Sequence, residues 1–326
     1  MDTSKGGKSN MSLPNKIRFN KLKVGFPRMG GYTEILGGFF EGLGIKVVLA
    51  SPYNEKAFKI AIANSPEMAC LPFKYNLADY IDILEKTDED ITLLQYKTCG
   101  RCRFHCYYFA HTEILRNLGY KFKGIRPIRS GIFTLLDLMY LTGNSMPEVL
   151  FSFQRAYKRF KELEEKIYPK TGPIRIGLIG EIWSLCDARA NLDLVEKLKN
   201  LGCYVENSLS LSHFVTDWFK MKVSLKRKLL RKRARKIFPE IIGGHAINSI
   251  ENFIVFSESG FDGIICVRPL SCMPESFVET MINSLADKYK MPLFIQNCDE
   301  MGSETNLENR LEAFIEGIRL KKDVYL

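Results

Sequence analysis

Nine cysteines are the residues in this 326-residue chain whose type and spacing could do chemistry. Three of them form a C-x2-C-x3-C run at Cys99, Cys102 and Cys106. A free cysteine is commonly buried and inert, and for any single one this is the simpler interpretation. For several cysteines with such spacing, metal binding is the better interpretation. The remaining cysteines are Cys70, Cys186, Cys203, Cys266, Cys272 and Cys298.

The spacing distinguishes zinc from an iron–sulfur cluster. A structural zinc site usually takes two C-x2-C pairs, or one pair with a matching pair of histidines. The chain has one C-x2-C, and its four histidines (His105, His111, His213 and His245) lack zinc-finger spacing. Thiolates that come from distant parts of a chain suit an iron–sulfur cluster better. The sequence therefore favours a cluster over zinc.

The elements that must position these cysteines alternate between short apolar runs and helical periods. In the first half we expect strands at 23–26, 46–49, 91–96 and 124–128, helices near 32–43, 73–84 and 103–118, and a mostly helical segment at 132–168. The turn-rich KTGP at 170–173 marks a domain boundary. In the second half we expect strands at 174–179, 204–209, 263–267 and 292–295 and helices at 191–201, 246–257, 274–289 and 307–320.

Strands that alternate with helices form parallel sheets covered on both faces. Two such series predict an α/β protein of two similar lobes that face a shared cleft. We assign residues 1–20 to a flexible N-terminus, 21–170 to a first lobe with a helical extension, and 171–326 to a second lobe. The second lobe includes a basic helical insertion at about 211–240.

Most of the cysteines fall where such sheets bind ligands. In open parallel sheets this place lies beyond the carboxyl ends of the strands. Only Cys203 and Cys266 lie at or inside predicted strands, and we interpret them as packing residues. The seven at the ligand edge are Cys70, Cys99, Cys102, Cys106, Cys186, Cys272 and Cys298.

The net charge of +10 is carried by one segment, Lys220–Lys236, which contains ten Lys or Arg and no acid. We interpret it as a basic helix that is either solvated surface or a docking face for an acidic protein partner. A nucleic-acid contact is disfavoured because no aromatic side chains interleave with the charges.

Several classes of protein lack their signals here. No apolar run approaches the roughly 18–20 residues of a membrane span, and the polar N-terminus has no secretory h-region. Cysteine use without an export signal predicts the cytoplasm. No dinucleotide or triphosphate motif is present, so that any ATP would be hydrolysed by a partner.

Several segments together resemble the 2-hydroxyacyl-CoA dehydratase superfamily, with the double-cubane cluster proteins and related activase-associated proteins as the most similar branch. C-x-P-F-K, C-R-F and C-x-P-E in one chain form a specific combination. The resemblance runs from about residue 23 to residue 320. Its segments are FPRMGGY (Phe26–Tyr32), CLPFK (Cys70–Lys74), CGRCRFHCYY (Cys99–Tyr108), GEIW followed by Asn191, DGIICVRPLSCMPE (Asp262–Glu275) and NRLEAF (Asn309–Phe314).

The resemblance implies two flavodoxin-like (Rossmann-like) lobes that hold a cluster in the cleft between them. Dehydratase subunits of this superfamily bind [4Fe–4S] on three cysteines, whereas double-cubane proteins bind a sulfide-bridged [8Fe–9S] cluster on six. By motif, Cys70, Cys102 and Cys272 would be ligands. Cys99, Cys106 and Cys298 are assigned by their strand-end placement, and Cys186 could replace Cys106 or Cys298.

The resemblance also implies partners. An ATP-hydrolysing activase of actin/Hsp70-like fold, with its own [4Fe–4S] cluster, would supply low-potential electrons, and a homologous subunit could complete a homo- or hetero-oligomer. We therefore expect an oxygen-sensitive iron–sulfur protein that carries out or relays a difficult reduction. The alternatives are a 2-hydroxyacyl-CoA dehydratase subunit and a non-catalytic electron-transfer or assembly module.

Four non-cysteine residues are expected near the cluster. Arg28 follows the first strand, Lys74 and Arg103 lie at helix starts, and Glu181 follows the first strand of the second lobe. Cations and helix N-termini near an anionic cluster stabilise its reduced form. The alternative for each of the four is a salt bridge between the lobes.

Overall fold

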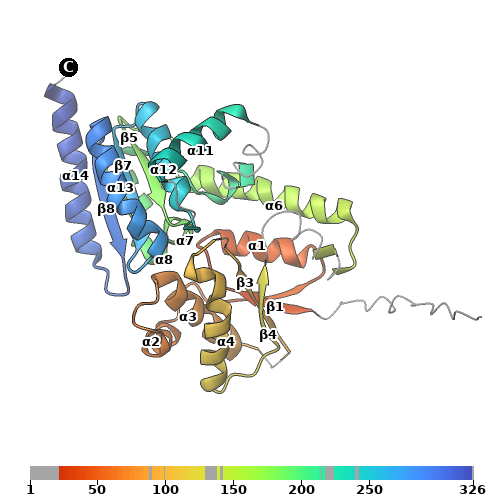
Figure 1. Ribbon diagram of the computed structural model, residues 1–326. Coiled ribbons are helices and arrows are strands. Elements are labelled where there is room, and N and C mark those ends of the chain that lie inside the picture. The colour runs from red at the N-terminus through yellow and green to blue at the C-terminus, as the bar shows by residue number, and fades with distance from the viewer. Residues whose placement is uncertain are drawn as a thin grey trace, which may run out of the picture.

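The structure is a computed structural model, and it describes residues 22–87, 90–98, 100–128, 138–139, 142–213, 215–216, 224–238 and 242–324. Its strands form two four-stranded parallel sheets, each with its own set of helices (Figure 1). The predicted α/β class with two flavodoxin-like lobes is confirmed. The predicted N-terminal segment 1–20 lies outside the described residues.

The first sheet has the strand order β2-β1-β3-β4, with every neighbouring pair parallel. Its elements are β1 (Lys23–Phe26), α1 (Tyr32–Glu41), β2 (Lys46–Leu49), α2 (Glu55–Asn64), α3 (Leu71–Glu85), β3 (Thr92–Tyr96), the 3-10 helix η1 (Arg103–Cys106), α4 (Tyr107–Asn117) and β4 (Gly124–Ile128). The long helix α6 (Met146–Ile167) follows, and a capping box between Ser145 and Glu148 begins it.

The second sheet has the equivalent order, β6-β5-β7-β8, and is also parallel. The same order in both lobes places the same kind of loop, the one after each central strand, at the ligand edge. The elements are β5 (Ile174–Gly180), α7 (Ile182–Cys186), α8 (Ala188–Asn191), α9 (Leu194–Asn200), β6 (Cys203–Asn207), α11 (Leu225–Ile237), α12 (Ala246–Glu258), β7 (Gly263–Pro269), α13 (Met273–Tyr289), β8 (Leu293–Cys298) and α14 (Glu304–Val324).

Two glycines show how closely helices cover the second sheet. A Cβ atom on Gly177 would lie 2.3 Å from the Phe256 ring of α12. A Cβ on Gly263 would lie 2.7 Å from Ile318 of α14. Gly263 pairs with Ile176, the neighbour of Gly177, so the two glycines belong to opposite faces of the sheet. Both faces are therefore buried, which is why these strands are almost continuously apolar.

Some helices and strands differ from the ranges that the sequence predicts. Helix α2 was not expected, although Asn54 caps it and buried Ala57, Phe58 and Ala61 lie on its inner face at helical spacing. The helix expected at 103–118 begins as the 3-10 turn η1. The strand expected at 292–295 continues to Cys298 because it pairs with β7 as far as Pro269.

The two lobes share one hydrophobic core rather than meeting only at a hinge. The Tyr75 ring of α3 lies 5.1 Å from the Trp183 ring of α7, measured between centroids. Helix α6 also joins the lobes, because Glu164 accepts hydrogen bonds from the Tyr32 hydroxyl (3.0 Å) and the Ser212 backbone N–H (2.9 Å). The ligand edges of the two sheets are thereby held in a fixed relation.

Candidate iron–sulfur site

Three of the predicted cysteines occupy the same local position, the residue directly before a helix. Cys70 precedes α3, Cys102 precedes η1 and Cys272 precedes α13. In α3 and α13 a proline stands two residues after the cysteine, where its fixed φ favours the helix start. The backbone N–H of Phe73, in the first turn of α3, donates to the Cys70 carbonyl oxygen at 2.9 Å.

The topology places these helix starts at one junction between the lobes. Cys102 follows β3 and Cys272 follows β7, the central strands at which the chain direction over the sheet switches. The Arg101 backbone N–H donates to the Ile242 carbonyl oxygen at 2.9 Å, which attaches the Cys102 loop to the second lobe. A Cβ on Gly244 would lie 3.0 Å from the Pro274 side chain and 3.8 Å from Cβ of Cys102. The loops that carry Cys102 and Cys272 are therefore neighbours.

Cys70 interacts electrostatically with both of the other thiols. Burial raises the pKa of the Cys70 thiol to about 11, with smaller contributions from the negative charges of Glu181 and Cys102. Burial also raises the pKa of Cys272 well above its ordinary value, with contributions from Glu275, Cys70 and Glu181. The pKa of Cys102 is raised by burial and by Glu181 in the same way. The charge of Glu181 thus acts on all three thiols, which come from both lobes.

The raised pKa values determine the protonation state of the three thiols. Burial disfavours the charged form of a group, so these thiols are neutral near pH 7 when nothing positive lies beside them. A cation reverses this preference and makes the thiolate the stable form.

Glu181, predicted near the cluster, has a clear structural role as well. Its carboxylate accepts hydrogen bonds from the Trp183 and Ser184 backbone N–H groups (2.9 and 2.8 Å) and from the Ser184 hydroxyl (2.9 Å), and so caps α7. Burial raises its pKa, and these three donors act in the opposite direction. In its ionised form this carboxylate opposes the addition of negative charge among the thiols.

Two further predicted ligands, Cys298 and Cys106, differ in their surroundings. Cys298 is buried at the end of β8, and burial together with the charge of Glu181 raises its pKa to about 12. Cys106 is exposed, and its thiol donates to the Arg103 carbonyl oxygen at 3.2 Å. The η1 turn thus directs Cys106 away from the buried thiols.

The remaining cysteines are placed as follows. Cys99 lies outside the described residues. Cys186, expected in a loop, is the last residue of α7, with its thiol 3.7 Å from the Leu209 carbonyl oxygen. Cys203 and Cys266 are buried within β6 and β7, which are the packing positions expected for them.

Two of the predicted cations are engaged in ion pairs. Arg28 donates to the Ala50 carbonyl oxygen at 2.9 Å and pairs with Glu34, both in the first lobe. Lys74 is buried and pairs with Glu300, so that it joins the helix of Cys70 to the loop after β8. Lys74 therefore forms a salt bridge between the lobes, which is the alternative role that the sequence suggested for it.

Arg103 links the two halves of the thiol site. Its Nη2 donates to the carbonyl oxygen of Ser271 at 2.7 Å. Ser271 has a φ of 63°, a left-handed conformation that costs energy in a non-glycine residue, and it directly precedes Cys272. The arginine beside Cys102 therefore holds the turn that presents Cys272.

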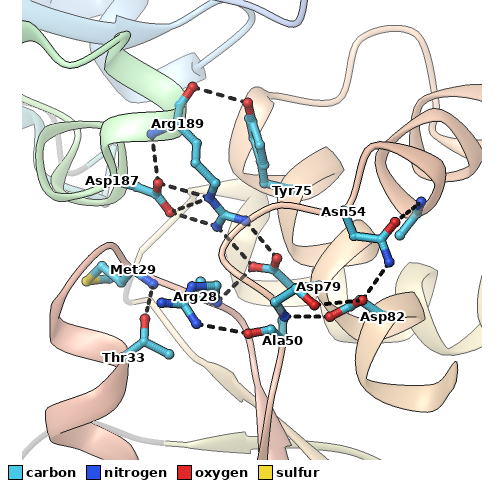
Figure 2. Close-up of polar contacts among 12 residues, drawn as sticks. Arg28, Met29, Thr33, Ala50, Asn54, Tyr75, Asp79, Asp82, Asp187 and Arg189 are labelled. Atoms are coloured by element: carbon cyan, nitrogen blue, oxygen red, sulfur yellow. Dashed lines mark hydrogen bonds and ion pairs between the residues drawn. The ribbon is translucent and has the colours of Figure 1, made fainter. Parts of the chain in front are cut away.

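A further interlobe network escaped the sequence analysis. Figure 2 shows Arg189 of α8 between the carboxylates of Asp187 and Asp79. Arg189 donates to Asp79 at 2.8 and 3.2 Å and to Asp187 at 2.7 to 3.2 Å, while Asp79 also accepts from the Arg28 backbone N–H at 2.8 Å. Tyr75 completes it by donating to the Arg189 carbonyl oxygen at 3.2 Å. No sequence motif contains this set.

A buried histidine positions the first-lobe thiols relative to each other. His111 lies between the Gln95 side-chain oxygen (3.0 Å) and the Phe73 carbonyl oxygen (3.1 Å), and Gln95 donates to the Phe104 carbonyl oxygen at 3.3 Å. Phe73 follows Cys70 in α3, and Phe104 follows Cys102 in η1. The network therefore fixes the distance between the two turns.

Within the described ranges, no group of three or more His, Cys, Asp or Glu side chains has the spacing to hold one metal ion. In the same part of the chain, no helix is both long and apolar enough to cross a bilayer.

A comparison with protein families assigns the chain. The model described as CoA enzyme activase uncharacterised domain (DUF2229) matches residues 23–209, which is more than half of the chain. The match covers the first sheet and continues to β6, so that it includes Cys70, Cys102 and Glu181. No curated protein matches the chain. This protein therefore belongs to the family of the CoA enzyme activase uncharacterised domain.

Proposed function

We propose that this protein binds an iron–sulfur cluster through Cys70, Cys102 and Cys272 and accepts low-potential electrons from an ATP-dependent activase. The observation that carries the proposal is the position of three thiols, from both lobes, at helix starts, with the loops of Cys102 and Cys272 in contact beside Gly244 and the charge of Glu181 acting on all three thiols. These thiols are also those of the dehydratase-like motifs C-x-P-F-K, C-R-F and C-x-P-E. The family description, which names CoA enzyme activases, supports the activase-type system.

The donor set fits a [4Fe–4S] cluster. Each thiolate of such a cluster binds a different iron, so the cysteines surround a volume instead of one ion. The buried thiols require a positive ligand to ionise, and iron insertion would therefore release their protons. When bound, the cluster would supply one-electron transfer. Cys70 and Cys102 would hold it from the first lobe and Cys272 from the second.

We propose three cysteine ligands, those of the three motifs, rather than six. The double-cubane [8Fe–9S] alternative requires three further thiolates. Of the candidates, Cys298 and Cys186 are both acted on by the charge of Glu181, Cys106 is exposed, and Cys99 lies outside the described residues. Three cysteines leave one iron of a cubane free of protein sulfur, which favours a dehydratase-type site over a simple relay.

The surroundings of the site would set the cluster's electron affinity. The Arg103 guanidinium lies beside Cys102, where its charge favours the thiolate. Glu181 acts in the opposite direction, because a buried carboxylate raises the energy of each added electron. Lys74 is neutralised by Glu300. The local balance suits a low-potential centre that needs a strong donor.

Iron retention in cysteine variants tests the proposal. The protein is purified without oxygen, reconstituted with iron and sulfide, and desalted before iron is counted. Cys70→Ala, Cys102→Ala and Cys272→Ala should each lose most of the iron, because each removes a thiolate with few substitutes. The matched controls Cys203→Ala and Cys266→Ala should keep it. Equal iron in all five variants would show that these thiols do not hold the cluster.

We also propose that α11 docks an acidic protein partner. Part of the basic segment, residues 220–223, lies outside the described residues. In α11, Arg231 pairs with Glu251 at 2.6 Å and Arg233 pairs with Glu258, so these cations attach the helix to α12. The outer side carries the largely exposed Leu225, the half-exposed Leu229 and the exposed Lys226, Lys228, Lys232 and Lys236. A basic face that includes two exposed leucines matches an acidic surface with an apolar part.

Charge reversal on the outer side tests the docking face. The variant replaces Lys226, Lys228, Lys232 and Lys236 with Glu, which spares the inward pairs. The control reverses four exposed lysines elsewhere, Lys56, Lys59, Lys158 and Lys161. The probe is an amphipathic peptide with a leucine stripe flanked by glutamates, measured by fluorescence anisotropy at low and physiological salt. Binding should fall in the α11 variant alone, and equal binding by both variants would refute the assignment.

A further inference from the structure

Tyr107 lies against one of the three proposed ligands. Its hydroxyl oxygen is 3.3 Å from the sulfur of Cys70, and both side chains are buried. Tyr107 is the first residue of α4, and its ring makes an edge contact with Phe73 at 4.8 Å between centroids. The Phe104 ring lies on it at 5.6 Å. The hydroxyl is therefore held at the sulfur by packing on two sides.

The direction of this hydrogen bond follows from the state of Cys70. In the free thiol either atom can donate. A thiolate has no hydrogen, so only the tyrosine hydroxyl can donate once Cys70 coordinates a metal. The ordinary pKa of a tyrosine hydroxyl is about 10, so the hydroxyl carries its proton at neutral pH.

We propose that Tyr107 donates a hydrogen bond to the Cys70 thiolate and thereby raises the reduction potential of the cluster. This inference rests on the proposed function and goes beyond it by naming a residue that tunes the centre. Hydrogen bonds to cluster sulfur stabilise the reduced state, because that state carries more negative charge on sulfur. Glu181 acts in the opposite direction, so the two side chains together set the potential.

The test compares Tyr107→Phe with Tyr108→Phe. The first variant removes only the hydroxyl beside Cys70 and keeps the ring in its packing. Tyr108 is the matched control because, among the described residues, its hydroxyl makes no hydrogen bond to a cysteine. Each protein is loaded with iron and sulfide, and its midpoint potential is measured by a redox titration followed by electron paramagnetic resonance. Tyr107→Phe should hold about tenfold less reduced cluster at a fixed potential, a shift of about 59 mV downward.

The outcomes separate this inference from the proposed function. Equal iron content and equal midpoint potentials in Tyr107→Phe and wild type would overturn the role of Tyr107. Absence of iron from the wild type would overturn the proposed function. In that case, or if Tyr107→Phe itself loses iron, the contact is tested in cluster-free protein by the rate at which iodoacetamide alkylates Cys70. Slower alkylation in Tyr107→Phe supports the hydrogen bond to sulfur, and an unchanged rate refutes it.

Discussion

The Arg189 network offers a quantitative test of how the lobes are held together. The perturbation is Arg189→Met, which keeps the apolar stem of the side chain and removes the guanidinium. That group bridges Asp79 of α3 and Asp187 at the start of α8 (Figure 2). The side chains of Arg189, Asp79 and Asp187 are 15%, 4% and 1% exposed, respectively. The substitution therefore leaves two buried carboxylates without their cation.

The expected loss follows from this burial. Removing one partner of a buried ion pair costs about 3–5 kcal/mol, because the remaining charge stays desolvated. Asp79 retains the Arg28 backbone N–H and Asp187 retains the Arg189 backbone N–H, so the loss should stay within that range. Arg189→Lys keeps a charge but loses the planar fork, and should lose about 1–3 kcal/mol.

Urea unfolding followed by circular dichroism measures these losses as changes in the free energy of unfolding. The control is Lys158→Met, which breaks an exposed pair with Glu162 whose atoms are 3.8 Å apart. That change should cost less than about 1 kcal/mol. If Arg189→Met lowers the free energy of unfolding no more than Lys158→Met does, the ion pairs of Arg189 do not hold the lobes together.

Three further predictions concern charge near the site. Burial lowers the pKa of His111 to about 3. The free energy of unfolding should therefore fall as the pH decreases from about 6.5 to about 3, by up to about 1.4 kcal/mol per pH unit, and His111→Gln should abolish that slope in urea titrations. Burial raises the pKa of Glu275 to about 8, so stability should fall as the pH rises from about 4.5 to about 8, and Glu275→Gln should remove this loss. Glu181→Gln should raise the midpoint potential of the loaded protein, the reverse of Tyr107→Phe, and a lower potential would contradict the role given to its charge.

The sheets could be predicted closely from the sequence. Buried parallel strands are short continuous apolar runs, and each of the eight strands lies within three residues of its expected bounds. The helix starts at Cys70 and Cys272 were also predictable, because Cys-x-Pro combines a cap position with a proline in the first turn. Helix α2 was missed, since its lysines interrupt the apolar pattern.

The detail of the site could not be predicted, because it depends on contacts between distant segments. Asp79 and Arg189 are 110 residues apart in the chain and belong to no motif. The exposure of Cys106 follows from the 3-10 turn of η1, which the expected continuous helix did not include. Tyr107 could have been noticed as an aromatic residue within the cysteine run, but its contact with Cys70 depends on how α3 packs against α4.

The central claim is that the wild-type chain holds an iron–sulfur cluster at the thiols of Cys70, Cys102 and Cys272. The most direct measurement counts iron and acid-labile sulfide per chain in protein purified without oxygen. The proposal predicts a brown protein with about four iron and about four sulfide per chain. Well above four iron would indicate the double-cubane form with additional ligands. A colourless protein that contains zinc, or no metal after reconstitution, would contradict the claim.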